Sequence, residues 1–73
     1  MDYKKFFEEV ADWIYKVNDM ATRYGMDSKE FWDWVMESTS EMSERYQNNK
    51  LVINQMTMLY MWLEDVNAEM KRG

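Results

Sequence analysis

Residues 56–63 read MTMLYMWL, and Thr57 is the only polar residue among them. An α-helix turns by about 100° per residue, so these eight side chains point around the whole circumference of a helix. A helix that is apolar on nearly every side is normally covered on several sides. The stretch therefore predicts a helix with more than one neighbour, which the rest of the chain must supply.

The sequence around this stretch predicts one helix over residues 50–71. Asn48 or Asn49 can cap its start, because Asn side chains accept hydrogen bonds from the first free N–H groups of a helix. Steps of four and three residues separate the apolar positions, which places them along one line of the helix. These positions are Val52, Met56, Leu59, Leu63, Val66 and Met70.

A second helix is predicted over residues 3–24, between Asp2 as N-cap and Gly25 as a left-handed stop. Its apolar positions follow the same alternation of steps. The expected core line is Tyr3, Phe7, Val10, Ile14, Val17, Ala21 and Tyr24, with Phe6, Trp13 and Met20 as a second row along one flank.

A third helix is predicted over residues 28–47. Asp27 with Glu30 resembles a capping box, and Met26 with Phe31 suits a hydrophobic staple. The expected core face consists of Phe31, Val35, Met42 and Tyr46, with the small residues Ser38 and Thr39 at its middle.

These patterns predict an all-α fold, a single domain over residues 1–73 built as a small antiparallel three-helix bundle. The chain has no Pro and only 2 Gly, which favours long helices, and its short connections favour antiparallel neighbours. A homodimer through the helix at residues 50–71 is an alternative way to cover the stretch MTMLYMWL.

Composition argues against several classes of function. The chain has no Cys and no His, which excludes disulfides and the common zinc sites. Its formal charge of −5 argues against binding nucleic acid directly and against an anionic membrane surface. It shows neither a secretory signal nor an apolar run of the roughly 20 residues that span a membrane. We expect a cytoplasmic protein without cofactor, metal or small-molecule substrate, and not an enzyme.

Several bulky apolar residues lie beyond the faces that a three-helix bundle should cover. Trp often anchors protein interfaces and Met fills them adaptably, although small domains also leave some core residues half exposed. The candidate apolar partner-binding residues are Trp32, Met36, Met58, Met61 and Trp62.

Acidic residues recur every three or four positions along the helix at residues 28–47. Such a stripe is consistent with a solvated face, with docking on a basic protein surface, or with a metal site. A metal site is disfavoured because ligands spaced along one helix cannot encircle an ion. The candidate acidic partner-binding residues are Glu30, Asp33, Glu37 and Glu41, and Glu44 continues the stripe.

The span MATRYGMDSKEFWDW, residues 20–34, has Ala21 four residues before Gly25 and apolar residues around them. This spacing resembles the helix-turn-helix motif, whose second helix enters the DNA major groove. Here the matching helix is acidic, so its contacts with phosphates would be repulsive.

The leading hypothesis is a non-enzymatic inhibitor or adaptor that docks on a larger protein. In one form of this hypothesis, the larger protein is one that handles nucleic acid. In size, acidity and helicity the chain is similar to small phage-encoded inhibitors, including some anti-CRISPR proteins. The partner is another protein, a second copy, or both. The alternatives are an assembly chaperone that shields an apolar segment, and a helix-turn-helix regulator, which the acidic second helix disfavours.

Overall fold

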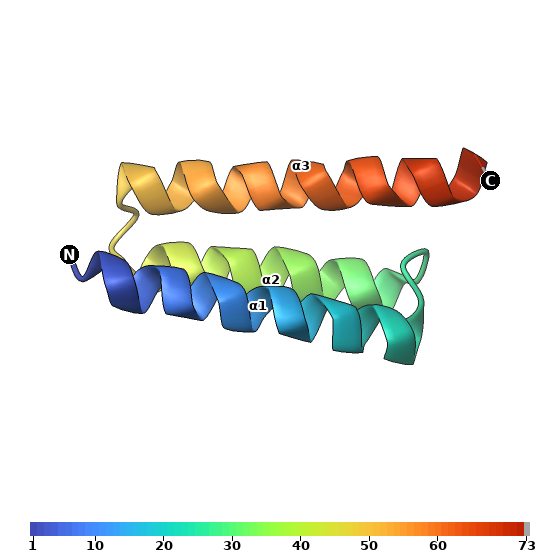
Figure 1. The fold of residues 1–73 in the computed structure, drawn as a ribbon, viewed down its shortest axis with the longest axis horizontal. Helices are drawn as coiled ribbons and strands as arrows, with labels where there is room; N and C mark the ends of the chain where they lie inside the picture. The colour runs from blue at the N-terminus through green and yellow to red at the C-terminus, as the bar shows by residue number, and fades with distance from the viewer. Residues whose placement is uncertain (73) are drawn as a thin grey trace.

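The computed structural model describes residues 1–72 and contains three helices, with no strand in that part of the chain. They are α1 (Tyr3–Tyr24), α2 (Lys29–Arg45) and α3 (Lys50–Arg72). The chain crosses the length of the molecule three times, and its principal extents are 40 × 20 × 18 Å (Figure 1). The prediction of an all-helical chain with three helices is confirmed. Gly73, the last residue of the predicted domain, lies outside the described residues.

The ends of α1 follow from its flanking residues. The carboxylate of Asp2 accepts a hydrogen bond from the N–H of Lys5 at 3.0 Å, which caps the first turn. At the other end, the N–H of Gly25 donates to the carbonyl of Ala21 at 2.9 Å. Gly25 has a φ of +82°, which an L side chain adopts only with strain, so α1 ends where glycine permits the chain to turn.

The start of α2 differs from the prediction, because Ser28 and not Asp27 is its N-cap. The hydroxyl of Ser28 accepts from the N–H of Phe31 at 3.1 Å and donates to the carbonyl of Gly25 at 2.8 Å. These two bonds tie the cap to the turn, so the helix starts after Ser28. The carboxylate of Asp27 instead lies 3.4 Å from the ammonium group of Lys71.

The connection from α2 to α3 also begins earlier than predicted, because α2 ends at Arg45. Gln47 and Asn48 have left-handed backbones, with φ of +58° and +56°, and this conformation cannot continue a helix. The side chain of Asn49 then accepts from the N–H of Leu51 at 2.9 Å, which caps the first turn of α3.

The three helices pack around one apolar core. The core positions predicted for α2 and α3 are largely confirmed, although Tyr46 and Val66 are only partly buried and Met70 is exposed near the end of α3. At 23 residues, α3 is longer than the 17-residue α2, so its last turns have less cover. The buried side chains from α2 and α3 are Phe31, Val35, Met42, Val52, Met56, Leu59 and Leu63.

The predicted core line of α1 needs a correction. Tyr3, Phe7 and Tyr24 are exposed, at 61%, 46% and 44%. The buried row instead includes Phe6 and Trp13, two residues of the predicted flank row. The helix is rotated toward α2, where an indole can both stack and donate a hydrogen bond. The buried residues of α1 are Phe6, Val10, Trp13 and Val17.

Helix α2 is the structural centre of the molecule. Its backbone approaches both other helices closely, whereas between the described residues of α1 and α3 no Cα atoms come within 8 Å of each other. Side chains of all three helices belong to one core cluster, while the backbones of α1 and α3 stay apart.

Candidate functional site

The five apolar candidate residues do not form one surface. Trp32 and Met36 lie on the side of α2 that faces α3, because both line hollows shared with Tyr60 of α3. Met58, Met61 and Trp62 line a separate hollow on α3 itself. The structure thus divides the predicted apolar set into two parts.

Trp32 is held in place by its own molecule. Its indole N–H donates to the carbonyl of Met26 at 2.6 Å. Its ring packs edge-on against Phe31 and Tyr60, with centroid separations of 5.3 and 5.7 Å. Trp32 is half-buried as a result and joins α2 to α3, so it offers a partner only part of its surface.

Met36 is 54% exposed and lines a groove between α2 and α3 with a cavity volume of about 490 Å³. Its apolar lining includes Ile53, Met56 and Tyr60, while hydroxyl, amide and carboxylate groups complete it. Sequence reasoning missed this α2–α3 groove, although serines spaced three apart on α2 are a signal that a neighbouring helix leaves space there. The lining residues are Met36, Thr39, Ser40, Ser43, Glu44, Asn48, Ile53, Met56, Thr57 and Tyr60.

The acidic candidates form a ridge along α2 that we define as Glu30, Asp33, Glu37, Glu41 and Glu44. Asp33 pairs with Lys29 at 2.7 Å, and Glu41 pairs with Arg45 at 3.0 Å. The hydrogen bond to Asp33 and its charge raise the pKa of Lys29, because both favour the ammonium form. Within residues 1–71, the other three carboxylates of the ridge take part in no ion pair.

The acidic ridge borders the α2–α3 groove. Glu44 belongs to both, since it continues the ridge and lines the groove. Helix geometry places Ser40 between Met36 and Glu37 around α2, about 40° from the first and 60° from the second. Asp33, Glu37 and Glu44 thus lie within about 100° of Met36 around α2. Glu41 lies farther round and lines a hollow shared with α1.

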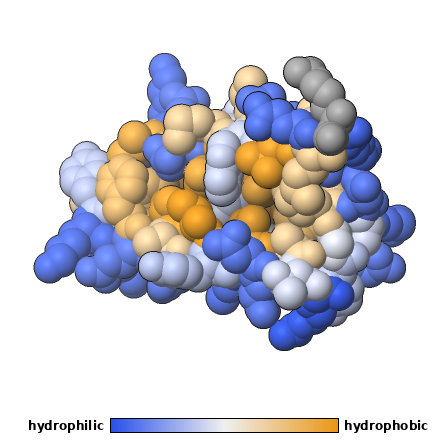
Figure 2. Space-filling model, turned by 45° about the vertical axis from the view of Figure 1, so that its right-hand side comes forward, coloured by the Kyte–Doolittle hydropathy of each residue, from blue (hydrophilic) through white to orange (hydrophobic). Residues whose placement is uncertain are grey.

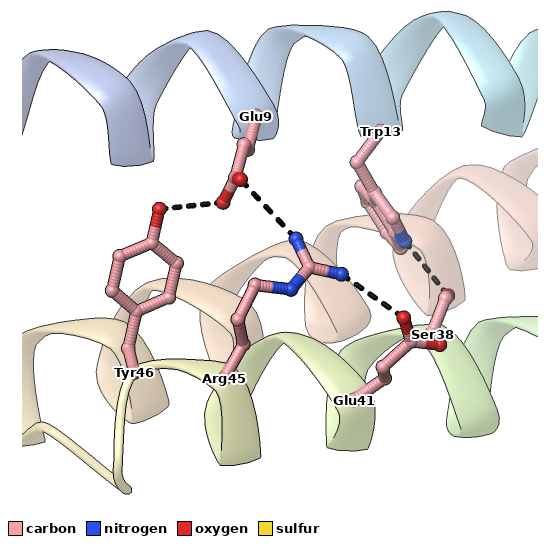
Figure 3. A network of polar contacts seen from close by, with 6 residues as sticks. All are labelled: Glu9, Trp13, Ser38, Glu41, Arg45 and Tyr46. Atoms are coloured by element: carbon pink, nitrogen blue, oxygen red, sulfur yellow. Dashed lines mark hydrogen bonds and ion pairs between the residues drawn. The ribbon is translucent and has the colours of Figure 1, made fainter.

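The opposite side of α2 is joined to α1 by polar contacts (Figure 3). The hydroxyl of Tyr46 donates to the carboxylate of Glu9 at 2.5 Å, and the guanidinium of Arg45 lies 3.2 Å from the same carboxylate. The bond to Glu9, together with burial, raises the pKa of Tyr46 to about 12. Farther along, the indole of Trp13 donates to the hydroxyl of Ser38 at 2.8 Å. Sequence reasoning did not find this network, because its partners are far apart in the chain.

The outer face of α3 carries the rest of the apolar candidates. Met58, Met61 and Trp62 are 55%, 58% and 42% exposed. Helix geometry puts Met58 and Trp62 on the flank opposite Tyr60, turned away from α2. Figure 2 shows hydrophobic side chains gathered in a band on the visible face of the molecule, with hydrophilic ones along its margins. We define the outer face of α3 by the residues of its hollow, Asn54, Thr57, Met58, Met61, Trp62 and Asp65.

Comparison of the chain with protein-family models, with curated proteins and with solved structures found no match in any of the three. Within residues 1–72, no three acidic side chains gather closely enough to hold a metal ion. In the same residues, no helix combines the length and apolarity that a membrane span requires. The surface features that could bind a partner are the α2–α3 groove, the acidic ridge and the outer face of α3.

Proposed function

We propose that this antiparallel three-helix bundle is a non-enzymatic protein-interaction module, a small inhibitor or adaptor that docks on a larger protein. One observation carries the proposal: the α2–α3 groove has apolar side chains in its lining, and Glu44 of the acidic ridge lines the same groove. An apolar centre with a polar rim is the usual anatomy of a protein interface.

The groove suits an amphipathic helix of the partner. It lies between two helices, and the side chains of Met36 and Ile53 in it are 54% and 40% exposed. A partner helix can lay an apolar face into such a groove. Flexible Met side chains adapt to the shape of whatever enters, which makes Met36 the principal apolar contact.

The acidic ridge selects a basic partner. Its unpaired carboxylates face solvent beside the groove, and the whole chain has a formal charge of −5. Complementary charge accelerates association and disfavours partners of the wrong sign. A row of carboxylates along a helix resembles a row of phosphates, so the proposed target is a protein surface that itself binds nucleic acid.

The test uses a model peptide, an amphipathic helix of Leu and Lys residues, titrated into the protein by calorimetry. We expect saturable binding that weakens at least tenfold in a Met36→Glu variant and in a Glu37→Lys/Glu44→Lys double variant. Raising the salt concentration should weaken binding as well, because exposed charges are screened.

Two controls separate specific docking from general attraction between opposite charges. A Glu8→Lys/Asp12→Lys variant changes the net charge by the same amount on α1 and should bind the peptide almost as well as the wild type. A peptide with Glu in place of Lys should not bind. Equal loss in both double variants would contradict docking at the groove. Binding that ignores both charge and salt would instead assign the groove to shielding an apolar segment, as an assembly chaperone does.

A further inference from the structure

We propose that the outer face of α3 binds a second copy of this chain, forming a two-fold symmetric dimer in which the two α3 helices pack antiparallel. This surface shares only Thr57 with the α2–α3 groove, and a second copy is a different partner from the one in the proposed function.

The outer face has an apolar centre that its own molecule leaves uncovered. Met58, Met61 and Trp62 are adjacent on α3, and about half of each side chain is exposed. Trp13 and Trp32 donate their indole N–H groups to acceptors in the protein, whereas within residues 1–71 the indoles of Trp34 and Trp62 have no such acceptor. Of these two, Trp62 is the one on the outer face, and it is 42% exposed. A large ring with an unused donor is typical of residues at protein interfaces.

The outer face is symmetric about its own middle. Met58 and Met61 lie at equal distances on either side of the point between Leu59 and Tyr60, and Asn54 and Asp65 lie at equal distances farther out. The last two are about three turns apart and differ by about 20° around the helix, so they lie on one line. A two-fold interface requires such a self-complementary pattern, because the same patch is used by both subunits.

Charge selects the antiparallel arrangement. In an antiparallel pair, the Met side chains of the two copies meet at the centre. The amide of Asn54 then faces the carboxylate of Asp65 of the second copy, and the N–H can donate to the carboxylate. Symmetry makes this contact twice. In a parallel pair, Asp65 would face Asp65 of the second copy, and like charges would repel each other.

The positions of Asn54 and Asp65 also favour a second copy over an unrelated partner. The amide of Asn54 and the carboxylate of Asp65 lie at opposite ends of the hollow, so each copy carries both members of the hydrogen-bonded pair. The dimer would also leave the acidic ridge and the α2–α3 groove of each copy open, since neither belongs to the outer face apart from Thr57.

The experiment measures the mass of the full chain by sedimentation equilibrium over a dilution series from about 1 μM to 1 mM. We expect a dimer with a micromolar dissociation constant, because the contact is small. Met61→Glu should give a monomer throughout. Asn54→Asp should weaken the dimer at least tenfold, because two carboxylates would face each other at both ends. Asn54→Lys should tighten it severalfold, because Lys can pair with Asp65 of the second copy.

Ser40→Asp and Ser40→Lys are the matched controls, since they make the same charge changes on α2 and should leave the dissociation constant unchanged. Circular dichroism should show that every variant keeps its helix content, because the altered positions are exposed. A wild-type chain that is monomeric at 1 mM would overturn the proposal. So would Asn54→Asp and Asn54→Lys variants that shift the dissociation constant in the same direction, or not at all.

Discussion

The two interfaces of α2 are built differently. Its contact with α1 has hydrogen bonds and an ion pair between side chains, and Trp13 stacks on Trp34 at 5.7 Å. Its contact with α3, up to residue 71, has no ion pair or side-chain hydrogen bond between the two helices. Apolar packing and the edge contact of Trp32 with Tyr60 hold it together.

The α1–α2 interface serves structure, and the looser α2–α3 interface leaves room in which we propose that a partner binds. Directional contacts fix the register of α1 on α2, because a hydrogen bond tolerates little displacement. Apolar packing tolerates gaps better, and the α2–α3 contact leaves a groove with a methionine half exposed in it. The stabilising polar contacts therefore lie on one side of α2, and the proposed binding surface lies on the other.

The largest loss of stability is expected from Phe31, which belongs to both interfaces of α2. Phe31 is fully buried at the core, and its ring lies beside those of Trp32 and Trp34. Phe31→Ala should lower the free energy of unfolding by about 3–5 kcal/mol, through lost burial and the cavity left behind. Urea unfolding followed by circular dichroism measures this. A loss below about 1 kcal/mol would show that neither interface depends on this ring.

A smaller effect should follow from breaking the α1 interface alone. Trp13→Phe removes the hydrogen bond to Ser38 and part of the stack on Trp34, and should cost about 1–3 kcal/mol. Ser38→Ala keeps the indole in place but removes its acceptor, and should cost about 1 kcal/mol. The same urea experiment compares the two. If Trp13→Phe left the free energy of unfolding unchanged, the polar contacts between α1 and α2 would not stabilise the fold as we expect.

The contact between Tyr46 and Glu9 in the α1–α2 interface should make stability depend on pH. The pKa of Tyr46 in the folded chain is about 12, above its ordinary value of 10.0, mainly because its hydroxyl donates to Glu9. The protonated phenol therefore stabilises the fold fully below pH 10, and this contribution disappears as the pH rises through 12. Urea midpoints from pH 9 to 11.5 should fall more steeply for the wild type than for Tyr46→Phe. Parallel curves would mean that the Glu9 contact contributes nothing.

The smallest change in stability is expected for a substitution in the α2–α3 groove. Met36→Ala should change the free energy of unfolding by no more than about 0.5 kcal/mol, because the side chain is half exposed. Met42 on the same helix is 5% exposed and is the matched control. Met42→Ala should cost about 2–5 kcal/mol. Equal losses for the two variants would make Met36 a core residue and weaken the proposed binding role.

The all-helical fold could be predicted because the spacing of apolar residues and the residues that cap helix ends are local properties of the sequence. Asp2, Gly25 and Asn49 each act on groups within four residues of themselves, and the structure uses all three. The choice between Asp27 and Ser28 was not predictable in this way. It depends on how Ser28 bonds back to Gly25 across the turn.

The surfaces were harder to predict than the elements. Periodicity identified Met36, Met58 and Met61 as exposed, since they lie off the core lines, but it could not show which of them share a surface. That division depends on the rotation of each helix about its axis. The rotation of α1 brings Trp13 to Ser38 of α2, and no local pattern reveals a hydrogen bond between residues on different helices.

The close approach of α2 to both neighbours, with α1 and α3 apart, also bears on how fast the chain folds. Each pair of helices that pack closely is also adjacent in sequence, so only a short loop must close before each pair can form. Chains dominated by such near-neighbour contacts fold in microseconds to milliseconds. Either pair of neighbouring helices can form first and serve as the template for the remaining helix. We expect rapid refolding from urea without a slow phase from proline, which the sequence lacks.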